Sequence, residues 1–256
     1  QAVERAMHEL RPRVVVNAAA YTAVDRAESN AEAAFRVNRD GPAYLAAVCA
    51  RHDAALIHIS TDYVFDGARP GAYAEDDPIA PLGVYGASKA AGEAAVRAAL
   101  PEHVILRTSW VYGAHGANFV KTMLRLAETR DDLRVVDDQR GCPTLAGDLA
   151  EAILSIAARI KAGAMPADGY GTFHCAGQGP TTWRLFAARI FELAGPRLGR
   201  TPRVTPIATS DYPTPAARPA NSVLDCGKLA RVHGLRLRPW PEALAELLDA
   251  TLVATH

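Results

Sequence analysis

The chain has 256 residues, 49% of them hydrophobic and 22% charged, a composition typical of a folded globular protein with one large or two small domains. Basic and acidic residues both number 28, so the net charge is zero, which disfavours a nucleic-acid binder or a protein of anionic membrane surfaces. No apolar run approaches the length of about 18 residues that a transmembrane helix needs.

The first half of the chain alternates β-branched runs with alanine-rich stretches. In chain order, the pattern predicts a helix at 1–10, a buried strand at 13–19, a helix at 31–51 broken near 38–41, a strand at 55–60, a helix at 84–100, a strand at 104–108 and a helix at 118–128. Strands and helices at this spacing predict βαβ units, and hence an α/β fold with a doubly wound parallel sheet covered on both faces.

Beyond residue 137 the pattern is less regular. Helices are predicted at 147–161, 182–194 and 241–254, with short strands at 171–175 and 203–207. We interpret residues 1–137 as the sheet domain and residues 138–256 as a smaller C-terminal α/β lobe, some segments of which return to the first domain. The proline-rich connection 62–83 is long enough to predict a functional or mobile loop.

A tyrosine and a lysine stand four residues apart at the start of a predicted helix, as Tyr85 and Lys89. Residues at this spacing share one helix face. A cation beside a phenol favours the phenolate, so the pair predicts a tyrosine with a lowered pKa that can act as a general acid or base. The alternative is a partly exposed helix whose lysine stem covers apolar surface.

Three polar residues end the preceding strand, as Ser60, Thr61 and Asp62. Ligands bind to open α/β sheets outside the carboxyl ends of the strands. These three side chains are therefore expected to face the same crevice as Tyr85. The alternative is a strand that ends in ordinary turn residues, with Asp62 as a cap.

Six segments of the chain occur in the order found in one family. They are VNAAAYTAVD at 16–25, STDYVFDG at 60–67, YGASK at 85–89, RTSWVYG at 107–113, NFVKTM at 118–123 and RPANS at 218–222. Together they closely resemble the dTDP-4-dehydrorhamnose reductases, which are extended short-chain dehydrogenases/reductases. The resemblance implies a Rossmann-like, NAD(P)-binding first domain and a substrate-binding second lobe.

The resemblance also implies a reaction and a role for each matching residue. The reaction is NADPH- or NADH-dependent reduction of the 4-keto group of dTDP-4-dehydro-6-deoxy-L-mannose to dTDP-L-rhamnose, in nucleotide-sugar and polysaccharide biosynthesis. Tyr85 donates the proton, Lys89 binds the nicotinamide ribose and lowers the pKa of Tyr85, and Thr61 orients the keto oxygen. Cofactor contacts are implied for Ala19, Ala20, Tyr21, Thr22, Asn38, Ser60, Tyr85 and Lys89, and substrate contacts for Val24, Thr61, Asp62, Tyr63 and Trp110.

The family's glycine-rich turn is absent from this sequence. That turn follows the first strand and lets the backbone approach a pyrophosphate at a helix N-terminus. No GxGxxG or GxxGxxG pattern occurs, and the sequence starts with Gln1. We therefore expect about forty residues, including the first βα unit, to precede Gln1. Without them, the chain as written is expected to bind NADPH weakly.

Two alternatives stay open on the residues alone. One is another extended short-chain enzyme of nucleotide sugars, an epimerase or reductase. A dehydratase is disfavoured because Tyr63, not a glutamate, follows Thr61 and Asp62. The other alternative is a non-catalytic regulatory subunit that resembles the β subunit of methionine adenosyltransferase. Retention of Thr61, Tyr85 and Lys89 together favours an enzyme.

The cysteines and histidines lack the spacing of metal sites. The cysteines stand far apart, which predicts reduced thiols in a cytoplasmic protein. The residues predict no protein-bound metal, although the family resemblance is compatible with a bound magnesium ion. The expected binding partner is a dTDP-sugar substrate, and no nucleic acid or membrane is expected to bind. The family resemblance is also compatible with a homodimer.

Overall fold

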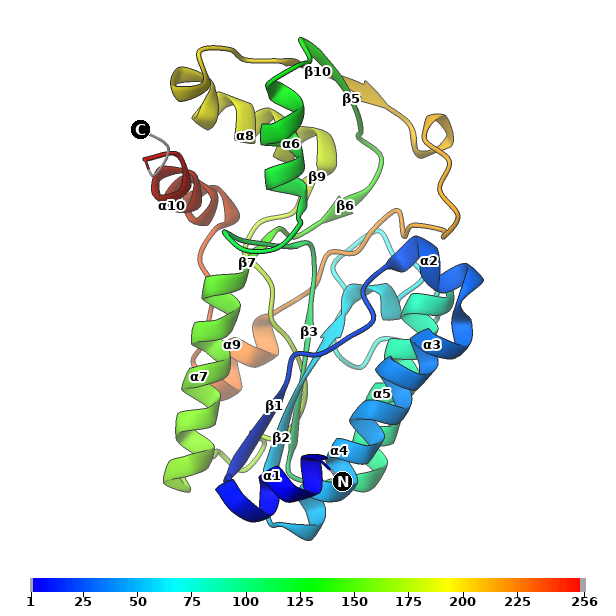
Figure 1. The fold of residues 1–256 in the computed structure, drawn as a ribbon, viewed down its shortest axis with the longest axis vertical. Coiled ribbons are helices and arrows are strands. Elements are labelled where there is room, and N and C mark those ends of the chain that lie inside the picture. Colours follow the sequence, from blue (N-terminus) through cyan, green and yellow to red (C-terminus); the bar gives the residue numbers. More distant parts are fainter. Residues whose placement is uncertain (1, 254–256) are drawn as a thin grey trace.

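A four-stranded parallel sheet forms the centre of the protein in the computed structural model, which describes residues 2–253 (Figure 1). Gln1 and Ala254, to which the predicted first and last helices extend, lie outside the described residues. The strand order is β1-β2-β3-β8, with β1 (Val14–Asn17), β2 (Ala55–Thr61), β3 (His103–Thr108) and β8 (Gly171–His174). The predicted α/β fold with a parallel sheet is thus confirmed.

Helices cover both faces of this sheet, because successive strand residues point to opposite sides. Ile57 and Leu106 pack with apolar residues of α7 and α9, whereas Leu56 and Ile105 pack with α1, α4 and α5. Figure 1 shows the two helical layers on either side of the strands. The elements are α1 (Ala2–Leu10), α2 (Val24–Ser29), α3 (Ala31–Phe35), the π-helical turn η1 (Arg36–Asp40), α4 (Gly41–Arg51), α5 (Val84–Ala99), α7 (Ala146–Ala162) and α9 (Gly227–His233).

A second lobe has its own hydrophobic core. Its elements are α6 (Phe119–Ala127), β5 (Asp132–Val136), α8 (Trp183–Leu198), β10 (Arg203–Ile207) and α10 (Trp240–Val253). β5 and β10 pair in parallel, and Phe186 and Ile190 of α8 are fully buried among the apolar residues of α6 and α10. The predicted boundary at residue 137 therefore needs correction. Residues 119–136 belong to this second lobe, whereas α7, β8 and α9 return to the first sheet.

Short elements join the two parts. They are the 3-10 turns η2 (Asp62–Val64) and η3 (Thr209–Asp211) and the two-residue strands β4 (Val111–Tyr112), β6 (Arg140–Gly141), β7 (Thr144–Leu145) and β9 (Thr181–Thr182). Within the described part of the chain, no helix has the length and apolarity needed to cross a membrane.

The first strand forms within its predicted range. In the part of the chain that the structure describes, β1 lies at one edge of the sheet, where Val16 is 43% exposed. Among the described residues β1 pairs only with β2, so one edge of its backbone lacks a neighbouring strand.

A close approach between α5 and η1 requires glycine at position 92. A Cβ atom built on Gly92 would lie 2.0 Å from the carbonyl oxygen of Asn38, which is backbone and has no room to yield. We expect Gly92→Ala to lower the free energy of unfolding by about 1–3 kcal/mol through overpacking. Urea denaturation measures this loss. Gly147→Ala in α7 is the matched control, because its nearest neighbours lie 3.9 Å away; equal losses in both variants would contradict the steric explanation.

Candidate active site

Polar side chains gather where the parallel strands end. Asn17 ends β1, Thr61 ends β2 and Thr108 ends β3, and all three are buried at the carboxyl edge of the sheet. The segment after β2 turns at once into η2, and α5 begins with Tyr85 in its first turn. Thr61 and Tyr85 therefore meet at one edge of the sheet, at the position where open α/β sheets bind ligands.

Thr61, Tyr63 and Tyr85 form a compact group. The rings of Tyr63 and Tyr85 meet edge to face, with centroids 5.5 Å apart. The Thr61 hydroxyl accepts a hydrogen bond from the Tyr63 backbone N–H at 3.2 Å and contacts the Tyr85 phenol. Gly86 allows this packing, because a Cβ atom there would lie 2.1 Å from the Tyr63 carbonyl oxygen. The structure thus brings the predicted acid and the predicted keto-orienting hydroxyl together.

The charge state of Tyr85 differs from the sequence prediction. The Tyr-x-x-x-Lys spacing predicted that Lys89 lowers the pKa of the phenol. Burial instead raises the pKa of Tyr85 to about 12, a rise that the contact with Thr61 opposes and the charge of Asp62 reinforces. The physical reason is that the Lys89 ammonium is engaged with groups of β2. Tyr85 is consequently a neutral phenol at physiological pH.

Lys89 lies almost entirely buried between α5 and β2. Its Nζ donates to the Ile59 carbonyl oxygen at 2.6 Å and lies 3.5 Å from Nε2 of His58. Burial lowers the pKa of Lys89 to about 8, although the nearby Glu93 carboxylate opposes this shift. Nδ1 of the same histidine lies 3.0 Å from Nδ2 of Asn17. Lys89 is therefore held by β2 in a buried position that keeps its ammonium close to titration.

Asn38 fixes the loop that follows β1. Its Oδ1 accepts from the Tyr21 N–H at 2.8 Å, and its Nδ2 donates to the Tyr21 carbonyl at 3.1 Å and to Ser88 Oγ at 3.0 Å. The fully buried Asn38 thus ties this loop to α5. The other predicted ligand contacts on this segment, Ala19, Ala20, Thr22 and Val24, are exposed or half-buried, so they are open to a ligand.

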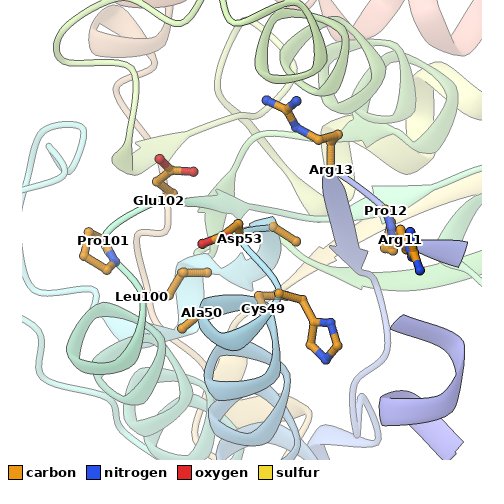
Figure 2. A pocket seen from close by; sticks show the side chains of 11 residues that line it. Arg11, Pro12, Arg13, Cys49, Ala50, Asp53, Leu100, Pro101 and Glu102 are labelled. Carbon is orange, nitrogen blue, oxygen red and sulfur yellow. The ribbon is translucent and has the colours of Figure 1, made fainter. Parts of the chain in front are cut away.

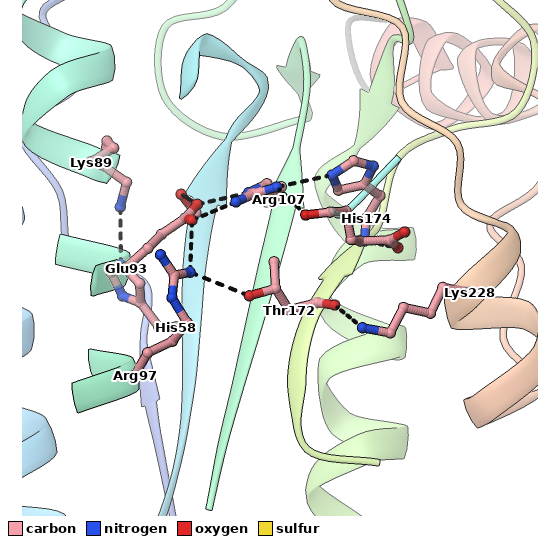
Figure 3. A network of polar contacts seen from close by, with 10 residues as sticks. His58, Lys89, Glu93, Arg97, Arg107, Thr172, His174 and Lys228 are labelled. Carbon is pink, nitrogen blue, oxygen red and sulfur yellow. Dashed lines mark hydrogen bonds and ion pairs between the residues drawn. The ribbon is translucent and has the colours of Figure 1, made fainter. Parts of the chain in front are cut away.

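Ser60 does not fit its predicted role in cofactor binding. Its hydroxyl donates to Oε1 of Glu93 at 2.6 Å inside the protein, and the residue is only 4% exposed. Glu93 and Arg107, both fully buried, form a bidentate pair at 2.8 and 2.9 Å (Figure 3). The Arg107 guanidinium lowers the pKa of Glu93 against the opposing effect of burial. No pattern in the sequence had indicated a role for this pair.

Asp62 is buried and Trp110 is half-buried, and both predicted substrate contacts pack against neighbouring residues of the site. Asp62 is 2% exposed and accepts a hydrogen bond from Thr61. The Trp110 indole stacks on Trp183 with ring centroids 3.5 Å apart. A Cβ atom on Gly141 would lie 2.3 Å from Cε2 of Trp110, so the indole also packs against Gly141. Trp110 adopts a φ of 49°, a strained left-handed conformation for this side chain.

One hollow of the protein lies far from this edge. It measures about 610 Å³ and lies before the first residues of the strands, lined by Arg13, Cys49, Asp53 and Glu102 among others (Figure 2). Basic and acidic side chains both line it, and it contains neither Thr61 nor the Tyr–Lys pair. We therefore place the candidate active site at the carboxyl edge.

A helix that begins with Tyr-x-x-x-Lys beside the carboxyl edge of a parallel sheet is the arrangement of the short-chain dehydrogenases/reductases, and this chain falls in that class. The family follows from its relatives. The family model described as the RmlD substrate binding domain matches residues 1–253. The chain belongs to the dTDP-4-dehydrorhamnose reductase family of oxidoreductases.

Individual relatives agree with this assignment. A dTDP-4-dehydrorhamnose reductase of Sinorhizobium fredii is 49% identical over 251 residues, which cover 98% of this chain and 84% of the relative. The crystal structure of the enzyme from Clostridium acetobutylicum superimposes with a TM-score of 0.89 at 42% identity, covering 97% of this chain and 84% of that one. The structure from Bacillus anthracis, in complex with NADP, has a TM-score of 0.89 at 38% identity and the same coverage.

Proposed function

We propose that this protein reduces the 4-keto group of dTDP-4-dehydro-6-deoxy-L-mannose to give dTDP-L-rhamnose. The observation that carries the proposal is the contact between the Tyr85 phenol and the Thr61 hydroxyl at the carboxyl edge, in a chain of this family. Ketone reduction develops negative charge on oxygen, so hydrogen-bond donors aimed at that oxygen stabilise the transition state. Two hydroxyls side by side provide such donors.

The residues along this edge fit a reduced nicotinamide dinucleotide. The accessible backbone from Ala19 to Thr22, held by Asn38, offers a surface for the cofactor, and the Lys89 ammonium is the cation suited to ribose hydroxyls. The Bacillus anthracis relative was solved with NADP, which favours NADPH here. The cofactor would supply the hydride, and the protein supplies position and a proton.

Tyr85 is proposed to deliver that proton. Its raised pKa keeps the phenol protonated at neutral pH, which is the form a reductase needs before the reaction. The product of proton transfer is a phenolate on α5, on the same helix as the Lys89 ammonium. Thr61, whose hydroxyl lies beside the Tyr85 phenol, is proposed to orient the keto oxygen.

The proposed activity can be tested by following NADPH oxidation by the purified protein with dTDP-4-dehydro-6-deoxy-L-mannose. We expect stoichiometric NADPH consumption and a product whose sugar has the L-rhamnose configuration by NMR. A folded protein that binds NADPH but does not turn over this sugar would point to another nucleotide sugar. Co-purification with a synthetase and no turnover of any keto sugar would favour the regulatory alternative.

Loss of the Asn38 side chain is expected to weaken cofactor binding. Asn38→Ala removes three hydrogen bonds and leaves Tyr21 backbone groups unpaired, so the loop after β1 loses its attachment to α5. We expect the Kd for NADPH to rise about tenfold, which corresponds to about 1.4 kcal/mol. Fluorescence titration measures it. Asn30→Ala is the control, since Asn30 is exposed and makes no side-chain cap; an unchanged Kd in Asn38→Ala would refute the role.

A further inference from the structure

The Thr61 hydroxyl has a single hydrogen, and in this structure that hydrogen is already committed. Thr61 Oγ1 donates to Oδ1 of Asp62 at 2.8 Å and accepts from the Tyr63 N–H at 3.2 Å. A hydroxyl can donate only one hydrogen bond. While Asp62 accepts the Thr61 hydrogen, the Thr61 oxygen can present only lone pairs, and no hydrogen, to a reacting keto oxygen. The proposed role of Thr61 as a donor therefore requires this bond to reverse.

Asp62 has the surroundings of a carboxyl group that can hold a proton. It is 2% exposed, and its Oδ2 has no hydrogen-bond partner within the described residues. The nearby Ser222 hydroxyl donates to the Arg140 carbonyl at 3.2 Å. Burial raises the pKa of Asp62 to about 6, with the polar contacts of Ser222 and Thr61 opposing the rise.

The titratable side chains that sense the charge of Asp62 are neutral. Tyr85 faces it from α5, Tyr63 from η2 and Cys142 from the loop between β6 and β7, and all three are neutral groups whose pKa values burial raises. No basic side chain is among the main influences on Asp62. A buried carboxylate with no cation is costly, so protonation is the accessible alternative.

We propose that Asp62 is a positioning residue whose protonation reverses the Thr61 hydrogen bond and frees the Thr61 hydroxyl to donate to the reacting keto oxygen. The inference rests on the proposed ketone reduction. In the ionised state the carboxylate accepts the Thr61 hydrogen. In the protonated state the carboxylic acid donates its own hydrogen to Thr61 Oγ1, and the Thr61 hydrogen turns to the substrate. Asp62 keeps its proton through the cycle, so the proton that reaches the product still comes from Tyr85.

The reversal sets the direction of a pH effect. Protonated Asp62 is the active form, so kcat is expected to fall as pH rises through the pKa of this carboxyl. Above that pKa, kcat falls about tenfold per pH unit, as for a single titrating group. The Tyr85 phenol would produce its own decline only at much higher pH. The two declines are therefore separable.

The test is the pH profile of kcat for wild type and Asp62→Asn, from about pH 5 to about pH 8. An amide can donate to Thr61 at every pH, so the decline is expected to vanish in Asp62→Asn. It should vanish also in Thr61→Val, at a lower overall rate, because no hydroxyl is left to reorient. A decline that persists in either variant overturns the proposal. An Asp62→Asn variant that binds NADPH normally but is inactive at every pH also overturns it.

A second measurement needs no substrate and separates this inference from the proposed reaction. Infrared difference spectra between wild type and Asp62→Asn protein report the carboxylic-acid band of Asp62. We expect that band to disappear with a midpoint near the pKa of about 6. Its absence at about pH 5 overturns the inference even if the enzyme reduces the keto sugar. If the band titrates as expected but wild type reduces no keto sugar at any pH, the proposed function fails instead.

Discussion

Tyr85→Phe is expected to lower kcat about 10²- to 10⁴-fold, the usual contribution of a positioned general acid. Phenylalanine keeps the ring that packs edge to face against Tyr63 but removes the hydroxyl that would donate the proton. The loop after β1 is held by Asn38, not by the Tyr85 phenol, so the Kd for NADPH should stay within about threefold of wild type. Steady-state NADPH oxidation and fluorescence titration measure the two quantities.

A second tyrosine provides the control for this experiment. Tyr44 lies on α4 and is 42% exposed, so Tyr44→Phe removes a phenol hydroxyl from the surface of a helix that carries none of the candidate site residues. Its kcat should equal that of wild type. If Tyr85→Phe kept more than about a tenth of the wild-type kcat, the proton would have to come from another donor, with Thr61 as the next group to substitute.

Local spacing explains why part of the candidate site could be predicted. Tyr85 and Lys89 are four residues apart on one helix, and helix geometry alone places them on one face. The break predicted near 38–41 corresponds to the π-helical turn η1, where Asn38 turns inward. These features depend on residues close in sequence, so a single sequence carries the signal.

Strand geometry carried a signal that the sequence interpretation overlooked. Ser60 and Thr61 were predicted to face one crevice, yet neighbouring residues of a strand point to opposite faces. Ser60 shares its face with His58, toward α5, and its hydroxyl meets Glu93. The two-residue period of a strand is enough, on the sequence alone, to separate Ser60 from Thr61.

Other features depend on contacts that no local pattern encodes. Glu93 stands in an alanine-rich helix, where a glutamate usually faces solvent, and only the packing of α5 on the sheet buries it against Arg107. The helix predicted at 118–128 was assigned to the sheet domain, and no strand was predicted at 132–136. Strand β5 at that position pairs with β10, about seventy residues later, and this choice of partner moves the segment to the second lobe.

Glu93→Gln is expected to lower the free energy of unfolding by about 3–5 kcal/mol, because it leaves a buried guanidinium without a counter-charge. Arg107 is 1% exposed and makes two of its hydrogen bonds to this carboxylate. Urea denaturation at neutral pH measures the loss. The pKa of Glu93 is lowered in the folded state. The ionised carboxylate therefore stabilises the fold fully above pH 4.5, its ordinary pKa, and this stabilisation disappears as the pH falls through the lowered pKa. The deficit of the variant should therefore shrink in acid.

Arg97 supplies the matched control for the buried pair. It also bonds Glu93, at 3.1 Å, but its side chain is 38% exposed, so water screens the interaction and Arg97→Ala should cost less than about 1 kcal/mol. Equal losses for Arg97→Ala and Glu93→Gln would contradict the importance of burial.

The buried Glu93–Arg107 pair also affects the candidate site, because the Glu93 carboxylate holds the Ser60 hydroxyl next to Thr61 and lies one turn beyond Lys89. Glu93→Gln should accordingly lower kcat even at temperatures where the variant is fully folded.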